Sequence, residues 1–272
     1  MEKVFSNILL PIQLKRNTDN IITRAVNLAN CLKCDLHVLC LNSPDFVFKR
    51  IFHSKSSRSD IANKKYQLHK LQNKYGPSIR HGSLFTTTFR EGNPIKETID
   101  YAVSQNIDMV LLGEGLKKLH LLPLTFRRFA DTAHCSILLG NSHSGILNVD
   151  KIILPIDQTL PIKRIRVAAF LAQQLQASIH LVCSGQKKIF ERNLPYMKKT
   201  YQLLKDNTDL TLTCFTSEGM DPGNAVLDYA NSVHAGLIIT NINKKSSNEN
   251  FFQRIFSRDH SRLEQTPIML VE

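Results

Sequence analysis

The chain carries the same series of sequence patterns twice, and this duplication limits its possible folds more than any other feature. Residues 7–13 read NILLPIQ and residues 151–157 read KIILPID. Later, a glycine, a helix-capping residue and a proline precede an Asp-Tyr-Ala triplet and an apolar run, first in 91–113 and again in 217–240. The copies lie much farther apart than the roughly 20–50 residues of a solenoid repeat, which indicates two duplicated domains.

We predict domain 1 in residues 1–141 and domain 2 in residues 149–272, joined by the polar linker 141–148. Short apolar runs alternate with longer amphipathic stretches, a pattern typical of βαβ units with a parallel sheet. The runs are continuously apolar, as strands buried on both faces require. Strands are expected near 7–13, 35–41, 83–89, 108–113, 136–140, 151–157, 178–183, 210–216, 236–241 and 267–271. Helices are expected near 18–33, 58–75, 93–106, 122–134, 161–176, 188–206, 221–234 and 251–264.

The chain is basic, with a formal net charge of +12 and a pI near 9.5. Such a surface attracts anions, but the Lys and Arg residues are scattered and no aromatic-basic recognition motif accompanies them, so nucleic-acid binding is not expected. The first residues lack the apolar core of a secretory signal, and no apolar run approaches the ~20 residues of a membrane span. The six cysteines show no secreted-framework spacing. These features favour a cytoplasmic location.

The order of motifs resembles that of the universal stress protein family in its tandem two-domain form. The most specific pieces are the segment 90–113 (REGNPIKETIDYAVSQNIDMVLLG) and the strand segment 133–140 (AHCSILLG), supported by KIILPID and by QTPIMLV at 265–271. The resemblance implies an α/β fold with two doubly wound, Rossmann-like domains, of the adenine-nucleotide-alpha-hydrolase-like kind, each with a five-stranded parallel sheet. It also implies that the domains pair through their last strands, so that one chain forms its own pseudo-dimer. A further homodimer is left open.

Many members of this family bind ATP, and the resemblance therefore implies a place for a nucleotide site. In the family pattern, Gly-x₂-Gly-x₉-Gly-Ser/Thr follows the fourth strand, and an Asp ends the first strand. Glycines let backbone N–H groups approach the phosphates, and the helix that follows offers a partial positive charge.

Each half of this chain retains different parts of that pattern. In the first half Gly113 matches, Gly115 comes one residue early, Thr125 lacks its preceding glycine, and Gln13 stands in the Asp position.

In the second half Asp157 is present and Ser257 matches the terminal hydroxyl, but Thr240 and Asn243 replace the glycines. A non-glycine residue forced to positive φ costs roughly 1–2 kcal/mol. We therefore expect no tightly bound cofactor and regard ATP as a disfavoured ligand.

Cys31 and Cys34, with His37 and Cys40 nearby, resemble a metal or redox site. A single Cys-x₂-Cys without a second pair is a weak signal. The His and the last Cys recur in the second half, whereas the Cys pair does not, so a place in the strand core explains them better. We predict no metal site and, because no nucleophile–base motif is visible, no enzyme activity.

The sequence therefore favours a non-catalytic binding or regulatory protein of universal stress type with degenerate nucleotide sites. One alternative is an ATP-binding switch with weak or slow hydrolysis. Another is an adaptor that contacts an unidentified protein partner or a membrane surface through the basic-aromatic segment 46–52. The similar cluster at 251–256 fits burial on a helix better.

Overall fold

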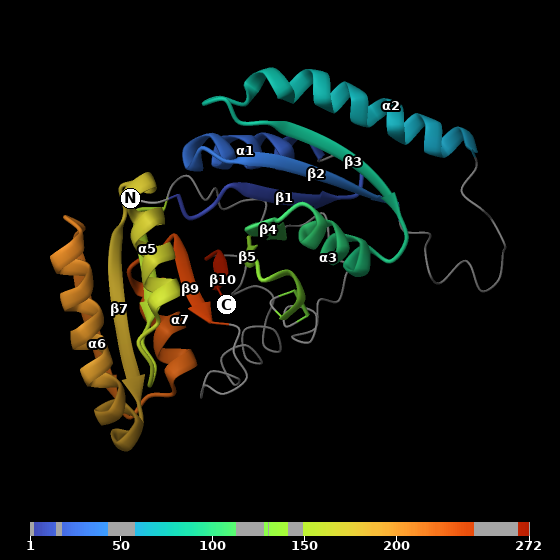
Figure 1. Cartoon of the computed structure of the whole chain (residues 1–272). Coiled ribbons are helices and arrows are strands. Elements are labelled where there is room, and N and C mark those ends of the chain that lie inside the picture. Colours follow the sequence, from blue (N-terminus) through green and yellow to red (C-terminus); the bar gives the residue numbers. More distant parts are fainter. Residues whose placement is uncertain are drawn as a thin grey trace, which may run out of the picture. The chain divides into compact units, whose positions relative to one another are not determined.

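The computed structural model shows two compact units, each built from strands that alternate with helices (Figure 1). The described part of the N-terminal unit lies within Phe5–His120 and 131–135. The described part of the C-terminal unit lies within Ser136–Glu272, together with residues 3–4 and 128–129. The structure describes residues 3–14, 18–42, 58–112, 128–129, 131–140, 149–241 and 266–271.

The N-terminal unit follows the predicted alternation of strands and helices. Its elements are β1 (Asn7–Ile12), α1 (Thr18–Leu32), β2 (Asp35–Asn42), α2 (Arg58–Tyr75), the 3-10 turn η1 (Gly76–Ser78), β3 (Phe85–Glu91), α3 (Pro94–Ser104) and β4 (Met109–Leu112). The C-terminal unit contains β5 (Ser136–Leu139), β6 (Lys151–Pro155), α5 (Ile162–Leu175), β7 (Ser178–Gly185), α6 (Lys187–Asn207), β8 (Leu212–Glu218), α7 (Pro222–Ser232), β9 (Leu237–Asn241) and β10 (Ile268–Val271).

Both units have the doubly wound topology that the alternation predicts. The strand order is β3-β2-β1-β4 in the N-terminal unit and β8-β7-β6-β9-β10 in the C-terminal unit, and the pairs within each series are parallel. Figure 1 shows α1 and α2 on one face of the N-terminal sheet and α3 on the other. This two-sided cover explains the continuously apolar strands: Ile8, Leu9, Ile152 and Ile153 are fully buried.

In each copy, the helix that follows the third strand begins as its sequence predicts. The side chain of Asn93 accepts hydrogen bonds from the backbone N–H groups of Ile95 and Lys96, and Pro94 opens α3. Asp221 accepts one from Asn224 N–H before Pro222 opens α7. Gly92 and Gly219 precede these caps at φ +146° and +85°, values that glycine adopts readily.

The last strands of the two copies pair antiparallel, as the resemblance implies. Ile268 lies opposite Leu139 and Leu270 opposite Ile137, while β10 pairs parallel with β9 on its other side. Met269 and Leu270 are fully buried. Pairing on both sides leaves β10 no open edge, which removes a template for aggregation.

The structure differs from the predicted elements mainly at their ends. β3 starts at Phe85 rather than at 83, because residues 80–83 form a turn in which Ser83 N–H bonds the carbonyl of Arg80. Residues 128–129 and 131–133 are helical, within the predicted helix 122–134. The predicted helix 251–264, the linker 141–148 and the segment 46–52 lie outside the described residues. The domain limits 1–141 and 149–272 remain a prediction; by compactness, β5 belongs with β10.

Candidate functional site

The carboxyl ends of β6 and β9 form the candidate site of the C-terminal unit. These strands are neighbours in the sheet, and the order continues through β7 and β8 beside β6 but through β10 beside β9, so the strand order reverses between them. Ligands of open α/β sheets bind at such a reversal. Asp157 follows β6 and Thr240 lies in β9, so two sequence-predicted positions lie at this end of the sheet.

The carboxylate of Asp157 is already engaged by the protein. Its Oδ2 accepts from Nη2 of Arg164 at 3.1 Å, and their side chains are 9% and 2% exposed respectively. Its Oδ1 accepts from the hydroxyl of Thr159 at 3.0 Å and from Thr159 N–H at 3.3 Å. A ligand that needs this carboxylate must therefore compete with a buried guanidinium.

Arg164 makes a second hydrogen bond, to the protein backbone. Its Nη1 donates to the carbonyl of Pro155 at 3.0 Å, which ties α5 to the end of β6. Burial lowers the pKa of Arg164, and the adjacent Asp157 carboxylate acts in the opposite direction. The two charges compensate each other in a place where neither would be stable alone.

Three further polar groups lie at or near these strand ends. Among the described residues, Thr240 Oγ1, Asn241 Oδ1 and Asn193 Oδ1 are buried without a hydrogen-bond partner, and Thr200 Oγ1, farther along α6, is a fourth such atom. The amide of Asn193, on α6, donates to the carbonyl of Ile156 at 3.5 Å. Buried polar atoms normally find partners, so these three are the groups of this unit best placed to meet a ligand. The sequence offered no signal for Asn193 or for Arg164.

The effect of Thr240 at the first glycine position differs from the predicted one. We expected a cost from positive φ, but Thr240 is a strand residue of β9 and is not among the residues with positive φ. That expectation is wrong at this position, because the strand continues through it. The Thr240 side chain is fully buried at this position.

The remaining nucleotide contacts expected from the sequence stay predictions. Gly113, Gly115, Thr125 and Ser257 lie outside the described residues. In the N-terminal unit, half-buried Gln13 follows β1 where β6 is followed by Asp157. The two copies therefore differ in charge at the matching strand end.

The Cys and His residues of β2 belong to the sheet core. Among the described residues, no group of three or more His, Cys, Asp or Glu side chains is placed to hold a metal ion. Burial raises the pKa of the Cys31 thiol, and it raises those of Cys40 and Cys183 to about 11. These thiols stay protonated at neutral pH, which makes them poor nucleophiles and poor metal ligands.

A matched histidine–tyrosine hydrogen bond occurs in both copies. His37 Nδ1 lies 3.1 Å from the hydroxyl of Tyr101, and His180 Nδ1 lies 2.9 Å from that of Tyr229. Each pair joins the second strand of its copy to the helix that carries the Asp-Tyr-Ala triplet. Sequence comparison finds the recurring His and the recurring Tyr separately, but their contact follows from the fold.

We expect these histidines to make stability depend on pH. Burial lowers the pKa of both His37 and His180, so both are neutral near pH 7. Below the ordinary histidine pKa of about 6.5, the unfolded chain binds more protons than the folded chain. The contribution of the two neutral histidines to the free energy of unfolding is therefore complete above this pH and is lost on acidification. The free energy of unfolding, measured with urea, should vary less between pH 7 and pH 5 in a His37→Gln/His180→Gln variant than in the wild-type chain. An equal flattening in a variant at exposed His81 would contradict this assignment.

Comparison with solved structures places the whole chain in one fold group. The model matches a universal stress protein from Archaeoglobus fulgidus with a TM-score of 0.68 at 13% identity, covering 98% of each chain. It matches a functionally unknown protein from Pseudomonas aeruginosa PAO1 with a TM-score of 0.65 at 15% identity, covering 99% of this chain and 93% of the other. The cytoplasmic domain of a prokaryotic cation chloride cotransporter matches with a TM-score of 0.57 at 12% identity, covering 98% and 95%. No family model and no curated protein matches the sequence.

The chain is therefore a tandem α/β protein of doubly wound units. Its particular fold is that of the universal stress proteins in their two-domain form, as the sequence resemblance implied. Within the described residues, the helices are all too short or too polar to span a membrane.

Proposed function

We propose that this chain is a non-catalytic stress-response protein of universal stress type that acts by binding, with nucleotide sites that have degenerated. The observation that carries the proposal is the buried pair between Asp157 and Arg164. In the family, the Asp at this position helps to hold the nucleoside. Here both of its oxygens have partners within the chain.

The energetics favour the ion pair between Asp157 and Arg164 over the binding of a nucleotide by Asp157. Separating a buried ion pair leaves each charge poorly solvated, a cost of about 3–5 kcal/mol when one partner is removed. Each 1.4 kcal/mol weakens binding by about tenfold. A ligand that displaced Arg164 from Asp157 would have to offset this cost before gaining any affinity.

The same tandem fold occurs in the cytoplasmic domain of a cotransporter, so the fold is compatible with more than one cellular role. The proposed role therefore rests on the site as well as the fold. We also propose that the protein is located in the cytoplasm and that it exerts its regulatory role through a partner. A homodimer is an additional proposal, for which analytical ultracentrifugation gives the mass directly.

Equilibrium dialysis with labelled ATP tests the degenerate-site proposal. We expect no binding at micromolar ATP and a Kd of about 1 mM or weaker, which corresponds to about −4 kcal/mol or less favourable. An Arg164→Ala variant serves as a probe of the blocking role, once its folding has been verified by circular dichroism. Micromolar affinity in the wild-type chain would contradict the proposal.

A further inference from the structure

Among the described strands, β3 is the last one at its end of the N-terminal sheet. The backbone N–H of Leu36 in β2 donates to the carbonyl of Leu84 at 2.8 Å, and that of Gly92 donates to the carbonyl of Asn42 at 3.3 Å. Alternate residues of a strand direct their backbone groups to opposite sides. The even-numbered residues of β3 therefore bond β2, whereas Phe85, Thr87 and Phe89 direct their N–H and C=O groups outward.

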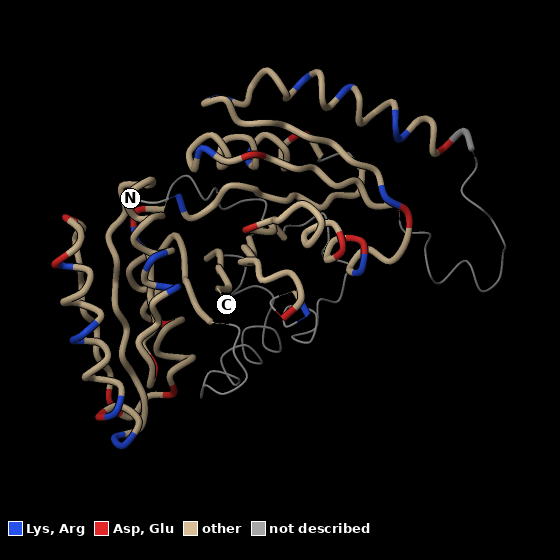
Figure 2. Tube along the Cα trace, in the orientation of Figure 1, with Lys and Arg blue, Asp and Glu red and all other residues tan. Residues whose placement is uncertain are grey.

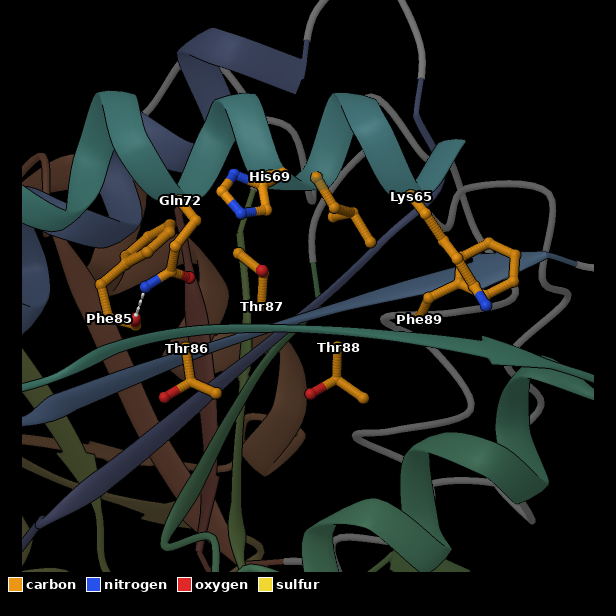
Figure 3. A pocket seen from close by; sticks show the side chains of 9 residues that line it. Lys65, His69, Gln72, Phe85, Thr86, Thr87, Thr88 and Phe89 are labelled. Atoms are coloured by element: carbon orange, nitrogen blue, oxygen red, sulfur yellow. Dashed lines mark hydrogen bonds between the residues drawn. The ribbon is translucent and has the colours of Figure 1, made fainter. Parts of the chain in front are cut away.

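A groove of about 620 Å³ lies along this edge, between β3 and α2. Figure 3 shows Phe85, Thr87 and Phe89 projecting toward α2, while Thr86 and Thr88 project from the opposite face of the strand. The amide of Gln72 on α2 already donates to the carbonyl of Phe85. In the described part of the chain, no strand pairs with the outward groups of Thr87 and Phe89.

The groove combines an apolar floor with positive charge. Leu68 and Phe85 are buried beneath it, at 5% and 6% exposure, and Phe89 is half-buried. Lys65 and His69 line it from α2, and its lining contains no carboxylate. Figure 2 shows further basic residues spaced along α2, whose sequence carries Asp60 as its single acid.

The charge argues for one kind of occupant. An edge strand accepts either a second copy of its own chain or an extended segment of another protein. Pairing two β3 edges would bring two basic α2 helices together on a chain that carries a formal charge of +12. Like charges across an interface oppose association, and opposite charges promote it.

We propose that the β3 edge binds an extended acidic peptide as an added strand. The peptide backbone exchanges hydrogen bonds with Thr87 and Phe89, and alternate side chains enter the groove. An apolar side chain packs on Leu68, and a carboxylate lies near Lys65. This surface is independent of the strand-end site in the C-terminal unit, so it does not depend on the proposed loss of nucleotide binding.

Fluorescence anisotropy on the full chain tests the proposal with labelled peptides that carry Val or Ile at one position and Glu two residues later, so that both side chains lie on the same face of the added strand. We expect saturable binding of these peptides. N-methylation of the peptide amides on one edge preserves charge and composition but removes the strand hydrogen bonds, and should abolish binding. Equal binding of methylated and unmethylated peptides, or no binding to any peptide of the set, would overturn the proposal.

Two matched pairs of variants locate the binding surface. Thr87→Pro removes an outward N–H without touching the ladder to β2, and should weaken binding by about tenfold or more, whereas Thr87→Val should bind like wild type. Lys65→Glu should weaken binding far more than Lys199→Glu, which changes the net charge equally but lies on α6. Unchanged binding in Thr87→Pro contradicts the proposal. So does concentration-dependent self-association that Thr87→Pro abolishes, because that result assigns the edge to a second copy.

Discussion

Replacing Arg164 with methionine is expected to lower the free energy of unfolding by about 3–5 kcal/mol. Methionine keeps an unbranched side chain but lacks the guanidinium, so the change removes the charge and its hydrogen bonds to Asp157 and Pro155. The Asp157 carboxylate then keeps its bonds from Thr159 but loses its cation in a place where its side chain is 9% exposed. Urea unfolding followed by circular dichroism measures the difference.

The exposed Arg166 provides the matched control, because it lies on the same helix. Arg166→Met is expected to change stability by about 0.5 kcal/mol or less, as surface substitutions usually do. The double variant Asp157→Leu/Arg164→Met removes both charges and should be more stable than Arg164→Met alone, because apolar replacement of a whole buried pair is often neutral. A loss below about 1 kcal/mol in Arg164→Met would show that the pair is not buried as described.

Replacing Leu270 with proline is expected to cost about 3 kcal/mol or more. Ile238 N–H bonds the carbonyl of Pro267, so the odd-numbered residues of β10 bond β9. Leu270 therefore directs its N–H toward β5, where it lies opposite Ile137. Proline removes one ladder donor and places its ring against a neighbouring strand. Thermal unfolding measures the loss, and this substitution tests directly whether the last strands of the two copies pair.

Thr216→Pro is the control for this experiment. Ile179 N–H bonds the carbonyl of Thr211, and Gly219 N–H bonds that of Gly185, so the odd-numbered residues of β8 face β7. Thr216 therefore directs its N–H away from the sheet, where proline is tolerated. Equal destabilisation by the two prolines would mean that β10 is not enclosed by two strands.

Sequence patterns predicted a helix or strand well where its position depends on residues that are close together in the chain. The apolar runs placed β1, β4, β6 and β9 to within about two residues, and α2 was predicted with its observed bounds. The caps at Asn93 and Asp221 were identifiable because a capping side chain bonds N–H groups only two or three residues away. β3 was placed too early, since its polar sequence TTTFRE gives little apolar signal.

The candidate site was only partly predictable. Asp157 could be identified from its place after a repeated strand motif, but Arg164 reads in sequence as one more basic residue of an amphipathic helix. Its burial at 2% exposure results from α5 packing over the end of β6. Likewise, the recurring His and Tyr residues were visible in the sequence, whereas the His37–Tyr101 contact spans 64 residues.

The sequence by itself determined the duplication, the βαβ alternation and the helix starts, because each follows from the chemistry of near neighbours. Tertiary structure alone decided that Asp157 is paired with a buried guanidinium and that, among the described residues, the outer edge of β3 is unpaired beside a basic helix. Each of those features depends on the distance between segments that the chain brings together only on folding. Desolvation, which sets the energy of a charge or of an exposed backbone group, depends on that surrounding structure.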